Sequence, residues 1–160
     1  MLWQVIKLKK SDYVLDVACG SGRLLKMLKQ KSSFYGYGLD ISETMIETAK
    51  KTNPEMEFVG GSCNNLPFAD NTFNIITTCA SFHHFYRPEN FVVEAYRVLQ
   101  EEGIIYLADV YYPHWLSIIL NLFIRFSTAG DDRFYAPKEI IKIFSSHGFE
   151  PLNTIVSDYR

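Results

Sequence analysis

One segment near the N-terminus constrains this chain more than any other, the run YVLDVACGSGR over residues 13–23. Its apolar residues predict a buried strand that stops at an acid, Asp16, and a turn through Gly20 and Gly22 that leads into a helix. A second apolar stretch ends at another acid, Asp40, twenty residues after Gly20. This order of strand, glycine turn, helix and acid-terminated strand is typical of a site for an adenosine-containing cofactor.

The acid before the glycine turn selects among such cofactors. A dinucleotide places its pyrophosphate at the start of the helix, where the charge of Asp16 would repel it. Leu25 also occupies the place of the third glycine in the dinucleotide pattern GxGxxG. A cofactor that carries an amino acid matches this turn better, because its ammonium can pair with Asp16 and its carboxylate can accept hydrogen bonds from the loop amides. S-adenosylmethionine has this structure, so we expect it as the cofactor.

Two of these residues also have a purely structural interpretation. Tight strand-to-helix turns use glycine for packing alone, so Gly20 and Gly22 do not by themselves establish a ligand site. Asp40 follows a strand, where its carboxylate can accept hydrogen bonds from ribose hydroxyls. It can equally serve as the N-terminal acid of the next helix, and the two roles are compatible.

Composition narrows the classes of protein to which this chain can belong. The chain has 160 residues, enough for one domain over 1–160, and its net charge of -2 gives no electrostatic footprint for nucleic acid. The longest apolar stretch, 115–124, is too short for stable membrane insertion. Three cysteines without CxxC spacing indicate reduced thiols in a cytoplasmic protein and no metal site.

Alternating strand-like and helix-like segments predict an α/β fold, a doubly wound, mostly parallel Rossmann-like sheet with helices on both faces. Strands are expected at about 13–17, 34–39, 56–59, 73–79, 103–111 and 149–157, and helices at about 22–31, 42–51, 88–99 and 137–147. Ser42, Pro88 and Pro137 stand where helices begin, and Gly148 follows the last one.

These motifs resemble the class I S-adenosylmethionine-dependent methyltransferases, and most closely the branch of ubiquinone and menaquinone biosynthesis methyltransferases. The resemblance covers most of the chain: VLDVACGSG at 14–22, GLDIS at 38–42, NLPFADNTF at 65–73, RVL at 97–99 and EG at 102–103. It implies transfer of a methyl group from S-adenosylmethionine to a small acceptor. Such relatives generally have further N-terminal helices and a last antiparallel strand, for which this chain has little length.

The resemblance also implies which residues border the cofactor. Ala18 replaces the family's first loop glycine, so we expect a φ below zero there. Ser62 and Cys63 stand where the family usually has an acid and a small residue that read the adenine, which predicts weaker adenine recognition. The implied cofactor-binding set is Asp16, Ala18, Cys19, Gly20, Ser21, Gly22, Asp40, Ile41, Ser62, Cys63 and Ala80.

Two histidines follow the strand that ends at Cys79. In the family this segment forms one wall of the acceptor site, so His83 or His84 could remove a proton from the acceptor. The alternative is that both histidines cap the turn. Methyl transfer depends largely on proximity and desolvation, so a catalytic base is not obligatory.

The segment at about 112–136 follows the fifth strand and is expected to act as a lid-like insertion. Its apolar residues suit a cover over a hydrophobic acceptor, but also a helix packed on the core or on a second subunit. A homodimer is therefore a candidate assembly. Two other functions stay open: a non-catalytic or truncated S-adenosylmethionine-binding module, and a nicotinamide-dependent oxidoreductase.

Overall fold

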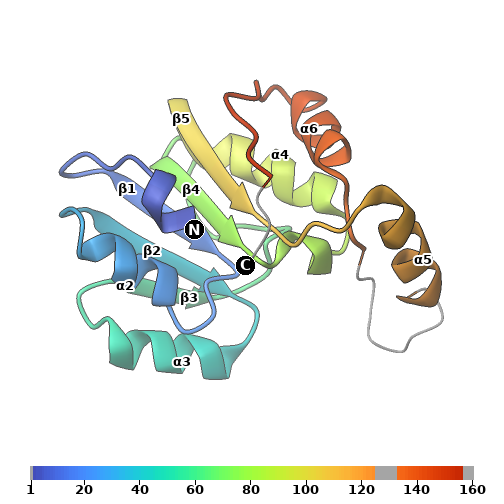
Figure 1. Ribbon diagram of the computed structural model, residues 1–160. Coiled ribbons are helices and arrows are strands. Elements are labelled where there is room, and N and C mark those ends of the chain that lie inside the picture. Colours follow the sequence, from blue (N-terminus) through green and yellow to red (C-terminus); the bar gives the residue numbers. More distant parts are fainter. Residues whose placement is uncertain (1, 125–132, 157–160) are drawn as a thin grey trace.

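The computed structural model describes residues 2–124 and 133–156, and its centre is a five-stranded parallel sheet (Figure 1). The strands lie in the order β3-β2-β1-β4-β5. Because β1 lies in the middle and the chain winds outward from it in both directions, the carboxyl ends of β1 and β4 form the switch point where such sheets bind ligands. The bounds are β1 (Tyr13–Val17), β2 (Tyr35–Asp40), β3 (Glu57–Gly60), β4 (Phe73–Cys79) and β5 (Leu99–Ala108).

Local sequence signals set the helix boundaries as expected. The Ser42 hydroxyl accepts a hydrogen bond from the Met45 amide at 3.4 Å and caps α3. Pro88 and Pro137 occupy the first positions of α4 and α6, where no amide donor is needed. The helices are α1 (Leu2–Val5), α2 (Arg23–Lys29), α3 (Glu43–Thr52), α4 (Pro88–Val98), α5 (His114–Ile124) and α6 (Pro137–Ser145), with a 3-10 turn η1 (Phe82–His84).

Successive residues of each strand point to opposite faces, and this alternation builds two cores. Val14 and Ile75 pack with residues of α2 and α3 on one face. Leu15 and Ile76 pack with α4 and α6 on the other face. The expected doubly wound sheet with helices on both faces is therefore confirmed, and both faces of β1 are closed to water, which leaves only the strand ends for a ligand.

Strand β5 begins and ends earlier than its expected range of 103–111. Leu99 pairs with Phe73 and Ile104 with Ile75, so the residues between them form an irregularity that keeps the chain in the sheet. Residues 99–102, which the sequence placed before the strand, are thus part of β5. β5 ends at Ala108, and the carboxylate of the next residue, Asp109, then accepts the Val110 amide at 2.8 Å.

The expectation of a sixth strand at 149–157 is wrong for its described part, because 149–156 forms no strand. Phe149 anchors the start of this segment, where its ring meets Tyr96 edge-on at 5.4 Å. Beyond it, Leu152 and Ile155 are 78% and 67% exposed. An apolar alternating segment becomes a strand only beside a partner, and β5 pairs on one side alone, with β4, within the described ranges.

A guanidinium fixes the loop that follows β3. Arg97 in α4 donates to the carbonyl oxygens of Phe68 and Leu66 at 2.8 and 2.9 Å. The same side chain pairs with Asp70 and Glu94, each at 2.7 Å. Because one planar fork satisfies both carbonyls and both carboxylates, Arg97 holds the whole loop against α4.

We therefore predict that Arg97→Lys lowers the free energy of unfolding by about 1–2 kcal/mol, because an ammonium cannot replace the fork. Arg133→Lys is the matched control. Arg133 pairs with Glu139 at 2.6 Å on the surface, and its substitution should cost less than about 0.5 kcal/mol. Urea unfolding of both variants measures the difference, and equal losses would contradict the assignment.

Candidate functional site

The residues expected to bind the cofactor gather at the carboxyl edge of the sheet. The Cys19 amide donates to the Leu39 carbonyl at 3.0 Å, and the Gly20 amide donates to Asp40 Oδ2 at 2.7 Å. The Gly61 amide donates to the Asp40 carbonyl at 2.9 Å. The loops after β1, β2 and β3 are therefore joined directly by hydrogen bonds around Asp40.

Asp16 lies within β1 and is 2% exposed. The Thr77 hydroxyl of the neighbouring strand β4 donates to Asp16 Oδ1 at 2.7 Å. Among the described residues, no donor is recorded for Oδ2. The buried side-chain atoms of the described part that have no hydrogen-bond partner are Trp3 Nε1 and Thr78 Oγ1, and Asp16 Oδ2 is not one of them, so this oxygen reaches the surface. A donor or a positive group that approaches it there would stabilise the charge of a carboxylate that is otherwise buried.

Burial dominates the electrostatics of this carboxyl. It raises the pKa of Asp16 from 3.8 to about 7, while the Thr77 hydrogen bond lowers the pKa and the charge of Asp40 raises it further. Near neutral pH the group therefore lies close to its titration point. A positively charged group at Oδ2 would draw it into the ionised form.

The two glycines of the turn have different roles. Gly22 has a φ of 74°, and a Cβ there would lie 2.7 Å from Asn53 Nδ2 and 3.0 Å from the Phe58 ring. Gly20 has a φ of 53°, but its Cβ would meet nothing within 4 Å. Gly22 is therefore required for packing, as the structural interpretation of the turn held, whereas Gly20 borders open space that a ligand could fill.

The expectation that Ala18 has a negative φ is wrong, because its φ is 58°. The chain leaves β1 through a left-handed residue so that the Cys19 amide can still reach the Leu39 carbonyl. An alanine in this region costs about 1 kcal/mol relative to glycine. The strain is retained at the point where the turn begins. Ala80, which follows β4, has a similar φ of 54°.

Other members of the expected set lie around this turn. The Cys19 thiol is buried and donates to the Gly20 carbonyl, with a sulfur–oxygen distance of 3.6 Å, and burial raises its pKa. Ser21 is half-buried between the two glycines. Ile41, directly after Asp40, is 81% exposed, so its apolar side chain is open to a flat ligand.

The loop after β3 brings Ser62 and Cys63 to the same edge. Ser62 is exposed, and its hydroxyl accepts the Asn64 amide at 3.2 Å. Cys63 packs against the core on the α4 side, and burial raises the pKa of its thiol to about 11. Its side chain therefore faces away from a ligand at the surface, which leaves the backbone of Cys63 as the part that could contact an adenine.

One important residue was missed by the sequence analysis. Asp109, directly after β5, accepts hydrogen bonds from the His83 amide and from His83 Nδ1, at 2.8 and 2.6 Å. His84 is exposed, and its ring centroid lies 3.9 Å from that of His83. Asp109 directly follows β5, whereas Asp16 and Asp40 lie in the last residues of β1 and β2. An acid at the carboxyl end of a strand was the signal that could have identified Asp109.

Cys79 lies between the part of the edge that contains Asp16 and the part that contains Asp109, and it is affected by the charges of both. Burial raises the pKa of Cys79, at the end of β4, and the charges of Asp16 and Asp109 raise it further. The Ala80 amide donates to the Ala108 carbonyl at 2.8 Å, so β4 and β5 end side by side. Asp40, Asp16 and Asp109 therefore lie along one continuous edge that begins at the glycine turn and ends at His83.

Comparison with known proteins agrees with this arrangement. Residues 15–107, more than half of the chain, match the family described as methyltransferase domain. The chain belongs to this family. This methyltransferase is 29% identical over 161 residues to demethylmenaquinone methyltransferase of Thermotoga maritima, across 87% of this chain and 70% of that protein.

Solved structures support the same assignment. A provisionally assigned methyltransferase of Bacillus halodurans C-125 superposes with a TM-score of 0.83 and 29% identity, over 93% of this chain and 67% of that one. A SAM-dependent methyltransferase of Thermotoga maritima superposes with a TM-score of 0.74 and 26% identity, over 94% of this chain and 70% of that one. This chain thus has the class I methyltransferase fold, and it spans about two thirds of the length of these proteins.

Two further observations concern the part of this methyltransferase that the structure describes. No group of three or more His, Cys, Asp or Glu side chains within it could hold a metal ion. None of its helices is long and apolar enough to cross a bilayer.

We predict opposite outcomes for the two glycines. Gly22→Ala should lower the free energy of unfolding by about 1–3 kcal/mol, because the new methyl meets Asn53 and Phe58. Gly20→Ala should cost only about 1 kcal/mol of backbone strain. It should nevertheless weaken binding of S-adenosylhomocysteine about tenfold or more, because the methyl enters the open space. Urea unfolding and calorimetric titration separate the two effects, and a Gly20→Ala variant that binds normally would show that the turn has no contact with ligand.

We also predict that Asp16→Asn stabilises the ligand-free protein. The Asn oxygen keeps the Thr77 hydrogen bond and removes a charge that burial disfavours. Because the pKa of Asp16 is raised from 3.8 to about 7, the cost of ionisation is full above pH 7 and absent below pH 3.8. Its upper limit is about 4 kcal/mol. Urea unfolding should show a gap between variant and wild type that is widest at pH 8 and narrows toward pH 5, and a gap independent of pH would contradict this.

Proposed function

We propose that this chain binds S-adenosylmethionine across the turn after β1 and transfers its methyl group to a small, apolar acceptor. The observation that carries the proposal is the buried Asp16, whose Oδ2 has no recorded donor among the described residues. The ammonium of the methionine part supplies both a donor and a positive charge for this oxygen. A phosphate at the same place would raise the cost of the buried charge.

The residues of the edge fit the rest of this cofactor. Asp40 accepts the Gly20 and Ser42 amides at 2.7 and 2.9 Å, one at each carboxylate oxygen. A carboxylate has about four acceptor positions, so two remain for the ribose hydroxyls. Ile41 supplies an apolar surface for the adenine, beside Ser62 and the backbone of Cys63. Gly20 and Ser21 border the methionine part, with Ala80 on the side of β4.

The cofactor supplies a methyl group that is already reactive because it is bonded to a positively charged sulfur. The protein has to hold the acceptor in line with that group and exclude water. Helix α5 begins beyond β5, at the ligand edge, and extends away from the sheet (Figure 1). Its residues Trp115, Ile118, Ile119 and Leu122 are 65%, 55%, 44% and 56% exposed.

These four side chains recur at helical spacing and form one apolar stripe. We propose that the segment 112–136, whose residues 125–132 lie outside the described part, forms a lid for an apolar acceptor. The name of the Thermotoga relative, demethylmenaquinone methyltransferase, supports an acceptor of the quinone type. The whole chain, 1–160, then works as one catalytic domain.

The test is a calorimetric titration with S-adenosylhomocysteine and, separately, with NAD, followed by transfer of labelled methyl groups to a naphthalenediol. We expect binding of the first ligand, no binding of the second, and a labelled product. Binding without transfer to any apolar acceptor would favour a non-catalytic binding module. Binding of NAD alone would favour an oxidoreductase and contradict the proposal.

We further propose a homodimer. The outer edge of β5 pairs with no other strand of the described ranges, and such an edge favours pairing with a second copy. The cysteines Cys19, Cys63 and Cys79 are free, which fits a reducing, cytoplasmic location. Light scattering should give the mass of a dimer at high protein concentration, and a monomer at all concentrations would exclude this assembly.

A further inference from the structure

His83 is held by two donors that reach the same carboxylate. Its backbone amide donates to Asp109 Oδ2 at 2.8 Å, and its ring Nδ1 lies 2.6 Å from Asp109 Oδ1. The two side chains are only 11% and 6% exposed. A backbone donor and a ring donor on one carboxylate fix both the position and the rotation of the imidazole ring.

The chemistry of this contact sets which nitrogen carries the proton. An ionised carboxylate only accepts hydrogen bonds, so Nδ1 must carry the hydrogen that points to Asp109. In the neutral ring the lone pair is then on Nε2. Within residues 2–124 and 133–156, no hydrogen-bond partner is recorded for Nε2. The lone pair on Nε2 can therefore accept a proton from a substrate.

Rigid elements support both members of the pair. Asp109 follows the last residue of β5, and its Oδ1 also accepts the Val110 amide at 2.8 Å. The His83 carbonyl accepts the Arg133 amide at 2.8 Å, and the Phe134 ring stacks on the imidazole with a centroid distance of 5.4 Å. Because Asp109, Arg133 and Phe134 hold His83, its ring should keep this geometry when substrate binds.

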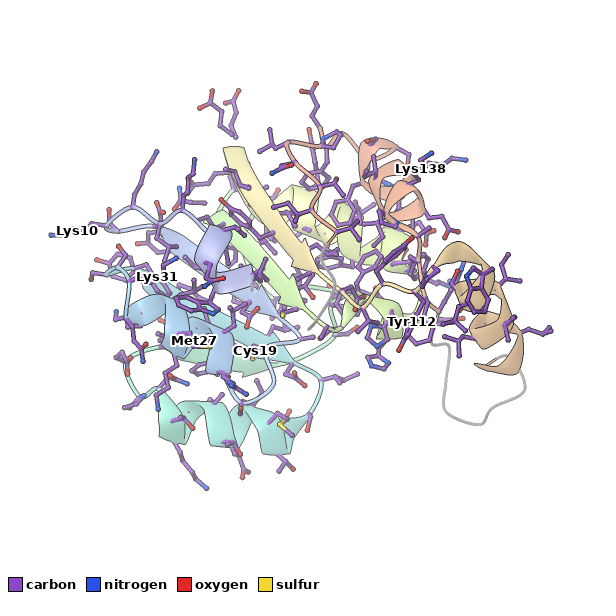
Figure 2. The ribbon with its side chains drawn as sticks, viewed as in Figure 1. Lys10, Cys19, Met27, Lys31, Tyr112 and Lys138 are labelled. Atoms are coloured by element: carbon purple, nitrogen blue, oxygen red, sulfur yellow. The ribbon has the colours of Figure 1, made fainter. Side chains whose placement is uncertain are left out.

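The pair also lies where the acceptor must be. β4 and β5 end in register, with Cys79 beside Ala108, so His83 and Asp109 both follow strands at the ligand edge. The charges of Asp16 and Asp109 both act on the Cys79 thiol. Tyr112, the third residue after Asp109, lies at the junction between the sheet and α5 (Figure 2). The pair thus stands between the expected cofactor turn and the apolar helix.

We propose that His83 Nε2 is the base that deprotonates the acceptor and that Asp109 is its positioning residue, which selects acceptors with an acidic O–H or C–H group. This inference rests on the proposed methyl transfer and adds the substrate class. The acceptor's proton moves to Nε2, and the electron pair left on the acceptor forms the bond to the methyl carbon. The carbon–sulfur bond breaks, its electron pair stays on sulfur, and the imidazolium returns its proton to water.

The imidazolium that forms in this step faces the charge of Asp109, which stabilises it. The sequence assigned the role of base to His83 and His84 alike. The carboxylate contact is recorded for His83, whereas His84 is exposed and its ring lies against that of His83. The geometry therefore favours His83 as the base.

The test uses Asp109→Asn, with Asp12→Asn as its matched control. Asp12 accepts the Lys9 amide at 2.7 Å in the turn before β1. That turn, marked by Lys10, lies at the opposite end of the sheet from Tyr112 (Figure 2). Asp109 Oδ1 contacts both His83 Nδ1 and the Val110 amide, so the oxygen of an asparagine should take the Oδ1 position and keep the ring hydrogen on Nδ1. Asp109→Asn therefore loses the hydrogen bond from the His83 amide and the negative charge that stabilises the imidazolium, while the size of the side chain is kept.

The first readout needs no ligand. Nitrogen-15 spectra of the histidine-labelled protein should show the hydrogen of His83 on Nδ1 in the wild type and in Asp12→Asn; a His83→Gln spectrum assigns the signals. A hydrogen on Nε2 in the wild type would overturn the role of Asp109. Because the wild-type spectrum alone decides the tautomer, a poorly folded variant does not remove the test.

The second readout is turnover of a naphthalenediol and of an apolar amine. For the diol, kcat should fall about 100-fold or more in Asp109→Asn and His83→Gln, with S-adenosylhomocysteine affinity within about twofold of wild type. The amine should be a poor substrate in every protein. An unchanged kcat in both variants would overturn this inference and leave the proposed function intact, whereas a wild type that binds no S-adenosylhomocysteine would overturn the proposed function itself.

Discussion

A carboxylate enclosed at the end of the central strand governs the whole carboxyl edge. Asp16 is 2% exposed and has one recorded donor, Thr77, within the described residues. Removing such a charge from water costs several kcal/mol, and one hydroxyl does not recover that cost. A sequence selected only for stability would place an amide or an apolar residue here. An acid at this position is explained if a positively charged group of a ligand pairs with it. The ligand-free protein is then less stable than the same fold would be with an uncharged residue at position 16.

The parallel sheet determines what lies around this acid. Because β2, β1, β4 and β5 run in one direction, Asp40 at the end of β2 and Asp109 directly after β5 come to the same edge. Gly20 keeps the space above the turn open, while Gly22 fits α2 against Phe58. At the other end of the edge, His83 is locked to Asp109. The proposed cofactor contacts and the proposed proton transfer thus lie at different places along the edge, and the register of the same sheet positions both.

Local pattern predicted the features that depend on short stretches of sequence. The bounds of β1 and β4 agree with the expectation because both segments consist mainly of β-branched and aromatic residues, which favour strands, between turn residues. Ser42, Pro88 and Pro137 start their helices as expected because capping and the missing proline amide act locally. Asp16 and Asp40 were predicted to bind the cofactor because a strand, a glycine turn and their spacing occur together, and the structure brings both to the carboxyl edge of the sheet.

Features that depend on a partner in space were not predicted. Nothing near Asp109 in the sequence indicates that a histidine 26 residues earlier donates to it. The positive φ of Ala18 follows from a hydrogen bond to Leu39 on another strand. The segment 149–156 has strand-like composition, but no neighbour pairs with it in the described part. In each case the deciding contact is long-range, and composition or periodicity does not contain it.

The most direct measurement of the central claim is the number of protons released when S-adenosylhomocysteine binds. Calorimetric titration in buffers of different ionisation enthalpy gives this number. With the pKa of Asp16 at about 7, most of the carboxyl is protonated at pH 6.5, and an arriving ammonium should expel that proton. We predict release of well over half a proton per site in the wild type and almost none in Asp16→Asn. Binding without proton release, or equal release by both proteins, would contradict the pairing of Asp16 with the cofactor.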